Sequence, residues 1–165
     1  MIKWLIVCLL MLVGCQNNAP KEQRIVRNGM AYHQAYNDDS ICIASVCLED
    51  DKIISAMIDE LTYLSKEEYK GLIEPEDESS KKIIASKIDN NEAYSQVMQA
   101  NGATKTINEN YDAICEYVIG KSVTDLQSDI EMKTDEEVVD LVAGCTLKST
   151  KGYIQAIINA CNQAN

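Results

Sequence analysis

Two runs of β-branched and small apolar residues, separated by four polar residues, limit the fold more than any other feature of the chain. The first run covers residues 40–48, the second covers residues 53–61, and Glu49-Asp50-Asp51-Lys52 lies between them. Two such runs around a short polar turn predict a β-hairpin. The second run also contains Met, Glu and Leu, which favour helices. We predict a strand there because the run can pair with the first one across the turn.

The clearest helical pattern covers residues 109–119. Asn108 is the expected N-cap and Gly120 the expected stop. The side chains that fall on the apolar face are Tyr111, Ile114, Cys115 and Val118. We expect this face to pack on the sheet.

Two more helices are expected towards the end of the chain. Thr134 and Glu137 have the spacing of a capping box, in which each side chain bonds the backbone N–H of the other. Residues 151–161 repeat apolar side chains at helical spacing, with Ser149 or Thr150 as the cap. The order of a hairpin followed by helices predicts a single α+β domain, with a small antiparallel sheet packed by several helices.

The segment between the hairpin and these helices has a weaker pattern. Residues 65–80 are strongly charged and predict an exposed insertion that is partly helical at its start. Residues 81–100 have scattered apolar side chains and predict one or two short helices.

The chain begins with the layout of an export signal. Lys3 precedes about ten apolar residues, fewer than the roughly 20 that a membrane-spanning helix needs. The run Leu12-Val13-Gly14-Cys15 resembles the lipobox of bacterial lipoproteins, in which the cysteine thiol receives a diacylglyceryl group and the peptide is cut just before it. The alternative is an ordinary secreted protein with a chance cysteine at this position.

This resemblance implies a division of the chain into three parts. Residues 1–14 would be the signal peptide, residues 15–38 a lipidated tether beginning at Cys15, and residues 39–165 the folded domain. We therefore expect a protein that is held on the extracytoplasmic face of the cell membrane by acyl chains and does not span it.

Charge and cysteine content exclude several classes of function. The chain has 15 basic and 26 acidic residues, a net charge of −11, and such a surface repels nucleic acid. Five cysteines follow the anchor, an odd number without a Cys-x-x-Cys pair, and His33 is the single histidine. We therefore predict neither a disulfide framework nor a metal site, and expect most of these cysteines to be buried as small apolar side chains.

No nucleophile, base and acid can be assembled for hydrolysis, because His33 lies in the predicted tether, and no glycine-rich phosphate loop of the usual spacing is present. The run DLVAGCTLKS at residues 140–149, followed directly by the last predicted helix, resembles the attachment motif of the FMN-binding domain family. That motif has an aspartate, two residues, Ser or Thr, Gly, Ala, the threonine that accepts FMN, a Thr-Ser pair and a helix. The chain differs from it at Ala143, Cys145 and Lys148.

The resemblance implies that a flavin transferase joins the FMN phosphate to Thr146, with Asp140 as the acid and Gly144 as the glycine of the motif. The tethered flavin would then carry electrons to a redox partner outside the cytoplasm. The turn Asp50-Asp51-Lys52-Ile53 supports the same family, whose members commonly have Asp-Gly-Lys-Ile between their first two strands. The tyrosines considered for contact with the flavin ring are Tyr63, Tyr94, Tyr111, Tyr117 and Tyr153.

Some features of the motif can be argued without the family. Glycine permits a backbone turn that other residues avoid, and a helix N-terminus offers free N–H groups and partial positive charge to a phosphate. Three interpretations stay open: a flavin-bearing redox carrier that is not a stand-alone enzyme, a surface lipoprotein with this fold but no flavin, and an interaction module whose acidic face meets a basic partner. Under the second and third, segment 140–149 is simply a helix end stopped at Gly144, with Thr146 or Ser149 capping the next helix.

Overall fold

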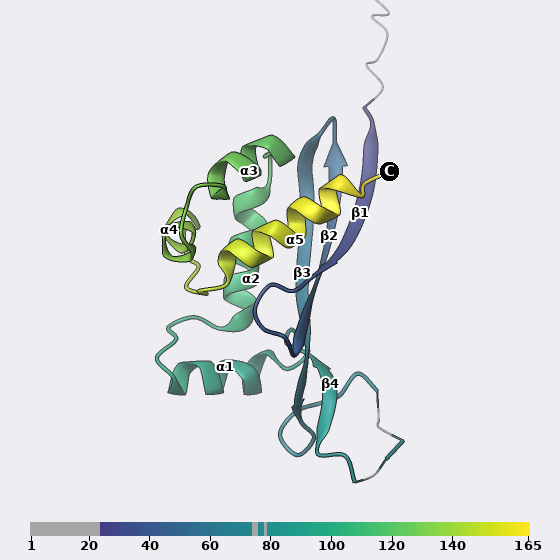
Figure 1. Cartoon of the computed structure of the whole chain (residues 1–165), viewed down its shortest axis with the longest axis vertical. Coiled ribbons are helices and arrows are strands. Elements are labelled where there is room, and N and C mark those ends of the chain that lie inside the picture. Colours follow the sequence, from purple (N-terminus) through teal and green to yellow (C-terminus); the bar gives the residue numbers. More distant parts are fainter. Residues whose placement is uncertain (1–23, 74–75, 78) are drawn as a thin grey trace, which may run out of the picture.

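The computed structural model describes residues 24–73, 76–77 and 79–165, which form one antiparallel sheet with helices against it (Figure 1). The four strands lie side by side in chain order. Their bounds are Val26–His33 for β1, Ser40–Glu49 for β2, Lys52–Ser65 for β3 and Lys82–Ser86 for β4.

The helices follow the strands in the chain and lie on one side of the sheet (Figure 1). α5 packs across β1 and β2, and α2 packs on β3. Within the described ranges, no helix has the length and apolar character needed to cross a bilayer. The bounds are Asn91–Ala100 for α1, Ile107–Val118 for α2, Val123–Ile130 for α3, Asp135–Leu141 for α4 and Thr150–Asn162 for α5. The predicted α+β class, with a small antiparallel sheet packed by several helices, is confirmed.

The hairpin of β2 and β3 has the predicted position and a tighter turn than expected. Asp50 and Asp51 have φ values of 48° and 67°, so both central residues are left-handed, as in a type I′ turn. This turn matches the twist of the two strands, which pair from Glu49 and Lys52 onwards. β3 continues to Ser65, beyond the predicted end at residue 61, because its last residues pair with β4.

β1 lies within residues 15–38, so the tether assigned to this segment is wrong for Val26–His33. All eight residues of β1 pair with β2. β1 is an edge strand, and Ala31 is its one fully buried side chain. An edge strand with so few buried apolar residues resembles a polar linker in sequence, which explains the error.

Three other expectations differ from the structure. Residues 81–100 contain β4 before their single helix α1, and the described part of residues 65–80 forms turns where a partial helix was expected. α3 was not predicted, although Ser122 caps it in a capping box with Asp125. The N-cap of α2 is Thr106 and not Asn108, because Thr106 forms a capping box with Glu109. The predicted capping box of Thr134 and Glu137 in α4 is confirmed.

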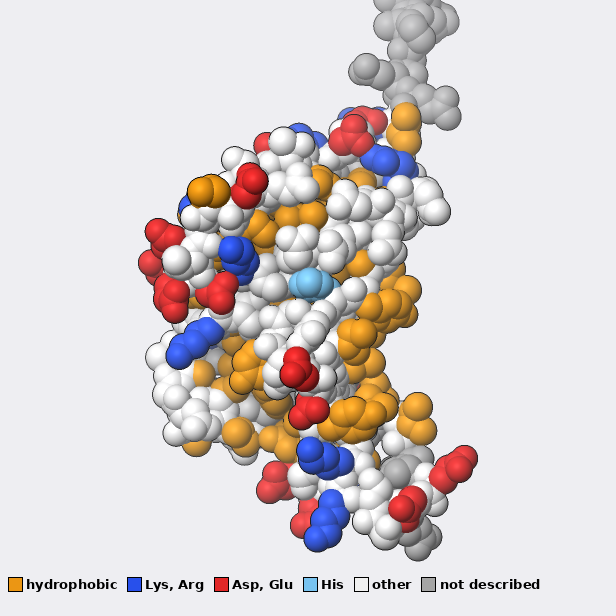
Figure 2. Space-filling model, viewed as in Figure 1, with side chains coloured by type: hydrophobic (Ala, Val, Ile, Leu, Met, Phe, Trp, Pro, Cys, Tyr) orange, Lys and Arg blue, Asp and Glu red, His pale blue; other side chains and the backbone are white. Residues whose placement is uncertain are grey.

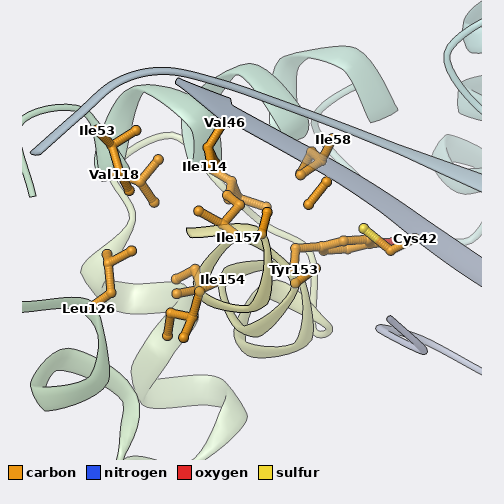
Figure 3. Close-up of a cluster of buried hydrophobic side chains, with 14 of the residues drawn as sticks. Cys42, Val46, Ile53, Ile58, Ile114, Val118, Leu126, Tyr153, Ile154 and Ile157 are labelled. Carbon is orange, nitrogen blue, oxygen red and sulfur yellow. The ribbon is translucent and has the colours of Figure 1, made fainter. Parts of the chain in front are cut away.

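The core lies between the sheet and helices α2, α3 and α5. Figure 3 shows Ile53, Val118, Leu126, Ile154 and Ile157 facing one another in this layer, and all five are fully buried. The predicted apolar face of α5 is confirmed, since all of its members are buried. The five cysteines in the described part of the chain are free, and Cys42, Cys145 and Cys161 are buried as expected.

In the part of the chain that the structure describes, no helix lies against the other face of the sheet (Figure 1). Figure 2 shows apolar side chains along the right-hand edge of the molecule, on the side away from the helices. The large apolar side chains exposed on this face include Met30, Tyr32, Ile41, Met57 and Tyr63.

Candidate functional site

A pocket of about 330 Å³ opens at the end of the sheet where α1 and the start of α5 meet the β1–β2 loop. The β1–β2 loop contributes Tyr36, and the stretch from the end of β4 to α1 contributes Lys87 and Tyr94. The loop before α5 contributes residues 146–149, and α5 contributes Tyr153. Three tyrosines and two lysines, Lys87 and Lys148, therefore converge on one cavity from four separate segments.

Thr146 lies at the rim of this pocket with an exposed side chain. Its backbone N–H donates to Asn110 Oδ1 at 2.6 Å, and its hydroxyl donates to the same oxygen at 3.2 Å. Asn110 is fully buried on α2, and its amide donates to Thr106 O at 2.7 Å. α2 thus holds the loop of Thr146 in place from inside the protein.

The turn before Thr146 needs a glycine. Gly144 has φ = 86°, a left-handed conformation that other residues adopt only with strain. α4 ends at Leu141, and Cys145 N–H donates to Val142 O at 3.0 Å. On the far side, Thr150 is fully buried and donates its hydroxyl to Leu147 O at 2.5 Å. The loop between α4 and α5 is therefore fixed at both ends.

Asp140 and Thr146, two of the predicted site residues, line a second pocket of about 200 Å³ together with Lys148. Asp140 is exposed on α4, and Thr146 also lines the first pocket, so Thr146 stands between the two. Gly144 lines neither pocket; it permits the left-handed turn that precedes Thr146. Ser149 is the N-cap of α5 but makes no side-chain capping bond, and Thr146 makes none either.

The predicted tyrosines divide into two groups. Tyr94 and Tyr153 line the pocket, and Tyr111 lies behind it, donating to the Tyr153 hydroxyl at 3.3 Å. Tyr63 and Tyr117 line none of the pocket's walls. Tyr36 was not considered, because it falls in the segment assigned to the tether.

Beneath the pocket lies a buried ion pair that sequence reasoning missed. Glu60 is 0% exposed and Lys87 3% exposed, and Lys87 Nζ donates to Glu60 Oε2. The same carboxylate accepts from the Tyr153 hydroxyl at 2.6 Å and from the Ser40 hydroxyl at 2.7 Å. Glu60 was included in the apolar run 53–61, where a single acid at an inward position was the available signal.

Burial and charge shift the ionisation of this cluster. Burial lowers the pKa of Lys87, but the neighbouring Glu60 carboxylate and Tyr94 together raise it by more than burial lowers it. The pKa of Lys87 therefore lies above its usual value. Burial, followed by the charge of Glu60, raises the pKa of Tyr153 well above 10.0. Burial also raises the pKa of the nearby Cys42 thiol to about 12. Lys87 is therefore charged, while Tyr153 and Cys42 stay protonated at neutral pH.

The described residues contain no group of three or more His, Cys, Asp or Glu side chains that could hold a metal ion. His33 lies in β1, and its Nδ1 is 3.5 Å from the Asn159 amide. It does not line the pocket of Thr146 and Lys87, but it lines a neighbouring pocket to which Tyr36, Lys148 and Ser149 also contribute. Comparisons of the chain with protein-family models, curated proteins and solved structures found no match.

Proposed function

We propose that the chain is a lipid-anchored electron carrier outside the cytoplasm, with FMN joined to Thr146. The observation that carries this proposal is the position of the Thr146 hydroxyl, which is exposed at the rim of a pocket lined by Tyr36, Tyr94 and Tyr153. Pockets for cofactors usually have volumes of about 300–1,000 Å³, so a cavity of about 330 Å³ suits the ring system of a flavin.

The residues around the pocket fit a flavin in three respects. Tyr36 and Tyr94 offer aromatic faces against which a flat ring can stack. Lys148 lines both pockets beside Thr146 and would place a positive charge near the phosphate. The first turn of α5 begins four residues after Thr146, and its N-terminal N–H groups favour an anion.

Attachment would form one phosphodiester bond. Thr146 Oγ1 would attack the phosphorus of an activated FMN donor with a pyrophosphate linkage, such as a flavin dinucleotide, and the phosphorus–oxygen bond to the nucleotide would break. The nucleotide leaves, and the threonine proton is released, so the protein gains FMN less one water. A separate flavin transferase would supply the catalysis, and the bound flavin would supply the redox chemistry.

The test is co-expression of the full chain with a flavin transferase, followed by mass spectrometry and visible absorption. We expect a yellow protein whose mass has increased by one FMN less water, and complete loss of both signals in Thr146→Ala. Ser149→Ala is the matched control, because its hydroxyl also lines the pocket and makes no capping bond. A label that persists in Thr146→Ala would disprove the site.

The membrane anchor is a separate part of the proposal. Cys15 and the signal segment lie outside the described residues, and the support is the lipobox-like run Leu12-Val13-Gly14-Cys15. Cys15→Ser should move the protein from the membrane fraction to the soluble fraction. Cys8→Ser, which changes a cysteine inside the apolar stretch, should not. Retention of the Cys15→Ser protein in the membrane fraction would contradict the anchor.

The alternative is a surface lipoprotein that keeps this pocket without flavin. Its support is the loss of hydroxyl residues around Thr146, where Ala143 and Lys148 replace the Ser or Thr of the related motif. A colourless protein of unmodified mass, from cells in which the transferase labels a control domain, would favour this alternative.

A further inference from the structure

Lys87 lies directly below the pocket and is held there by its own backbone. It follows the last residue of β4, and its N–H donates to Glu60 O at 3.0 Å. Its side chain returns to the same residue, because Nζ donates to Glu60 Oε2. Two bonds to Glu60 therefore fix both ends of the lysine.

The ammonium group of Lys87 also faces the aromatic wall of the pocket. Nζ lies 4.9 Å from the centroid of the Tyr36 ring and 4.8 Å from that of the Tyr94 ring. Both distances are within the range of cation–π contacts. The charge therefore lies beside two of the tyrosines that line the pocket, and Lys87 itself forms part of the lining.

Fold stability does not explain this pair. Replacing a buried ion pair by apolar residues of similar volume is often neutral or stabilising, because desolvation opposes the attraction. Most other buried side chains are apolar, such as Ile53, Ile114 and Ile157, and among the described residues Glu60 and Lys87 are the buried side chains that carry charge. The polar cluster also occurs at the pocket and not at the opposite end of the core.

Hydrogen bonds surround the Glu60 carboxylate, whereas the Lys87 ammonium also faces aromatic rings. The Glu60 carboxylate accepts three hydrogen bonds, from Lys87, Tyr153 and Ser40. The Lys87 ammonium has three N–H donors; it donates to the Glu60 carboxylate, and a side-chain hydrogen bond with Tyr94 also favours its charged form. Its remaining positive charge is directed at the rings that line the pocket.

We propose that Lys87 is a positioning residue that stabilises negative charge on a flavin ring in the pocket, with Glu60 holding the lysine in place and limiting its effect. The inference rests on the proposed function. Two electrons and one proton convert the oxidised ring into a reduced ring with one negative charge, and a chemical reductant such as dithionite supplies the electrons in the test. A positive charge nearby favours the reduced form and makes the flavin easier to reduce.

The experiment compares wild-type protein with Glu60→Gln and with the double variant Glu60→Gln/Lys87→Met, all labelled by the transferase. Both variants avoid an unpaired buried carboxylate, which would strongly destabilise Lys87→Met alone. Glu60→Gln keeps the lysine and removes its counter-charge, whereas the double variant removes both charges. Lys121→Met is the control, since Lys121 is a partly exposed lysine that lies 4.4 Å from the Tyr117 ring, away from the pocket.

The readouts are the protein mass and the reduction midpoint, measured against a reference dye. We expect the equilibrium constant for reduction of the flavin to be at least tenfold smaller in the double variant than in Glu60→Gln. This corresponds to a midpoint lower by about 30 mV for two electrons. Glu60→Gln should favour the reduced flavin more than the wild type does, and Lys121→Met should equal the wild type.

The failures are distinguishable. Wild-type protein that takes no label, while a control domain is labelled, would overturn the proposed function and this inference together. If all the proteins are labelled and their reduction equilibrium constants agree within threefold, the role of Lys87 alone is overturned. If the double variant takes no label, the comparison of Glu60→Gln with the wild type decides, and equal midpoints there overturn the role of Lys87.

Discussion

The two ends of the layer between sheet and helices are built on opposite principles. At one end, Ile53, Val118 and Leu126 pack with purely apolar neighbours (Figure 3). At the other end, Glu60 and Lys87 are as deeply buried but depend on hydrogen bonds and opposite charge. The apolar end needs shape alone, whereas the polar end must satisfy every charge, and it is the polar end that borders the pocket.

α5 contributes to both ends within a single turn. Ile154 and Ile157 face the apolar cluster, and Tyr153 carries its ring into the same layer while its hydroxyl reaches Glu60 (Figure 3). The boundary between the two ends is therefore as narrow as one helical residue. Substitutions on the two sides of this boundary should therefore differ in how much stability they remove and in whether the loss depends on pH.

The largest effect is expected at the polar end. Lys87→Met leaves the Glu60 carboxylate buried without its cation, which should lower the free energy of unfolding by about 3–5 kcal/mol. Denaturation in urea measures this change. Lys121→Met breaks a partly exposed pair with Asp129 and should cost no more than about 1 kcal/mol. Equal losses in the two variants would contradict the contrast between buried and exposed charge.

At the apolar end, Ile157→Ala should cost about 3 kcal/mol, because it removes buried carbon and leaves a cavity. Ile54→Ala is the matched control. Ile54 is 47% exposed at the register shift between β2 and β3, so its truncation should cost no more than about 0.5 kcal/mol. Thermal unfolding followed by circular dichroism measures both. The Ile157→Ala loss should be the same at pH 7 and pH 10.5.

Alkaline pH should weaken the polar end specifically. Burial, followed by its neighbour Tyr153, raises the pKa of Tyr111 in the folded state above the ordinary value of 10.0. The raised pKa means that its stabilising contribution is complete below pH 10 and decreases as the pH rises above that value. Each such tyrosine should cost about 1.4 kcal/mol per pH unit. Above pH 10, Tyr111→Phe should make the fall of unfolding free energy with pH less steep by about 1.4 kcal/mol per pH unit. An unchanged slope would refute the raised pKa of Tyr111.

The smallest effect is expected from the helix cap that serves the site indirectly. Thr106→Ala removes the capping box of α2, the helix that carries Asn110, and should cost about 1 kcal/mol. Thr134→Ala removes the equivalent box of α4 and provides the comparison. Both variants should still accept flavin at Thr146, since neither changes a pocket residue. Loss of the flavin label in either variant would contradict this expectation and would show that the helix cap is needed to hold the loop of Thr146 in place.

The apolar end was predictable from the sequence, and the polar end was not. Helical spacing identified the buried face of α5, and alternation identified the hairpin. The contact of Glu60 with Lys87 joins residues 27 positions apart, and the pattern of either segment alone carries no information about it. β1 was missed for a related reason, because pairing with β2 and not its own burial keeps it in the sheet.

Asn110 and Tyr36 illustrate the same limit at the site. Asn110 occupies a position on α2 where apolar spacing calls for a hydrophobic side chain, with Ile107 three residues before it and Ile114 four residues after it. A polar residue at such a position was a readable signal for a buried contact. The pocket position of Tyr36 depends on the loop between β1 and β2, which could be placed only after β1 was known.

The course of β1 has a consequence for orientation. The strand enters at the upper end of Figure 1 and runs for eight residues, about 25 Å, towards the end where α1 lies. An attachment upstream of Val26 would therefore lie at the start of β1, and the β1–β2 loop with Tyr36 follows at the other end of that strand. The eight residues of β1 would therefore separate such an attachment from the pocket that Tyr36 and Thr146 line.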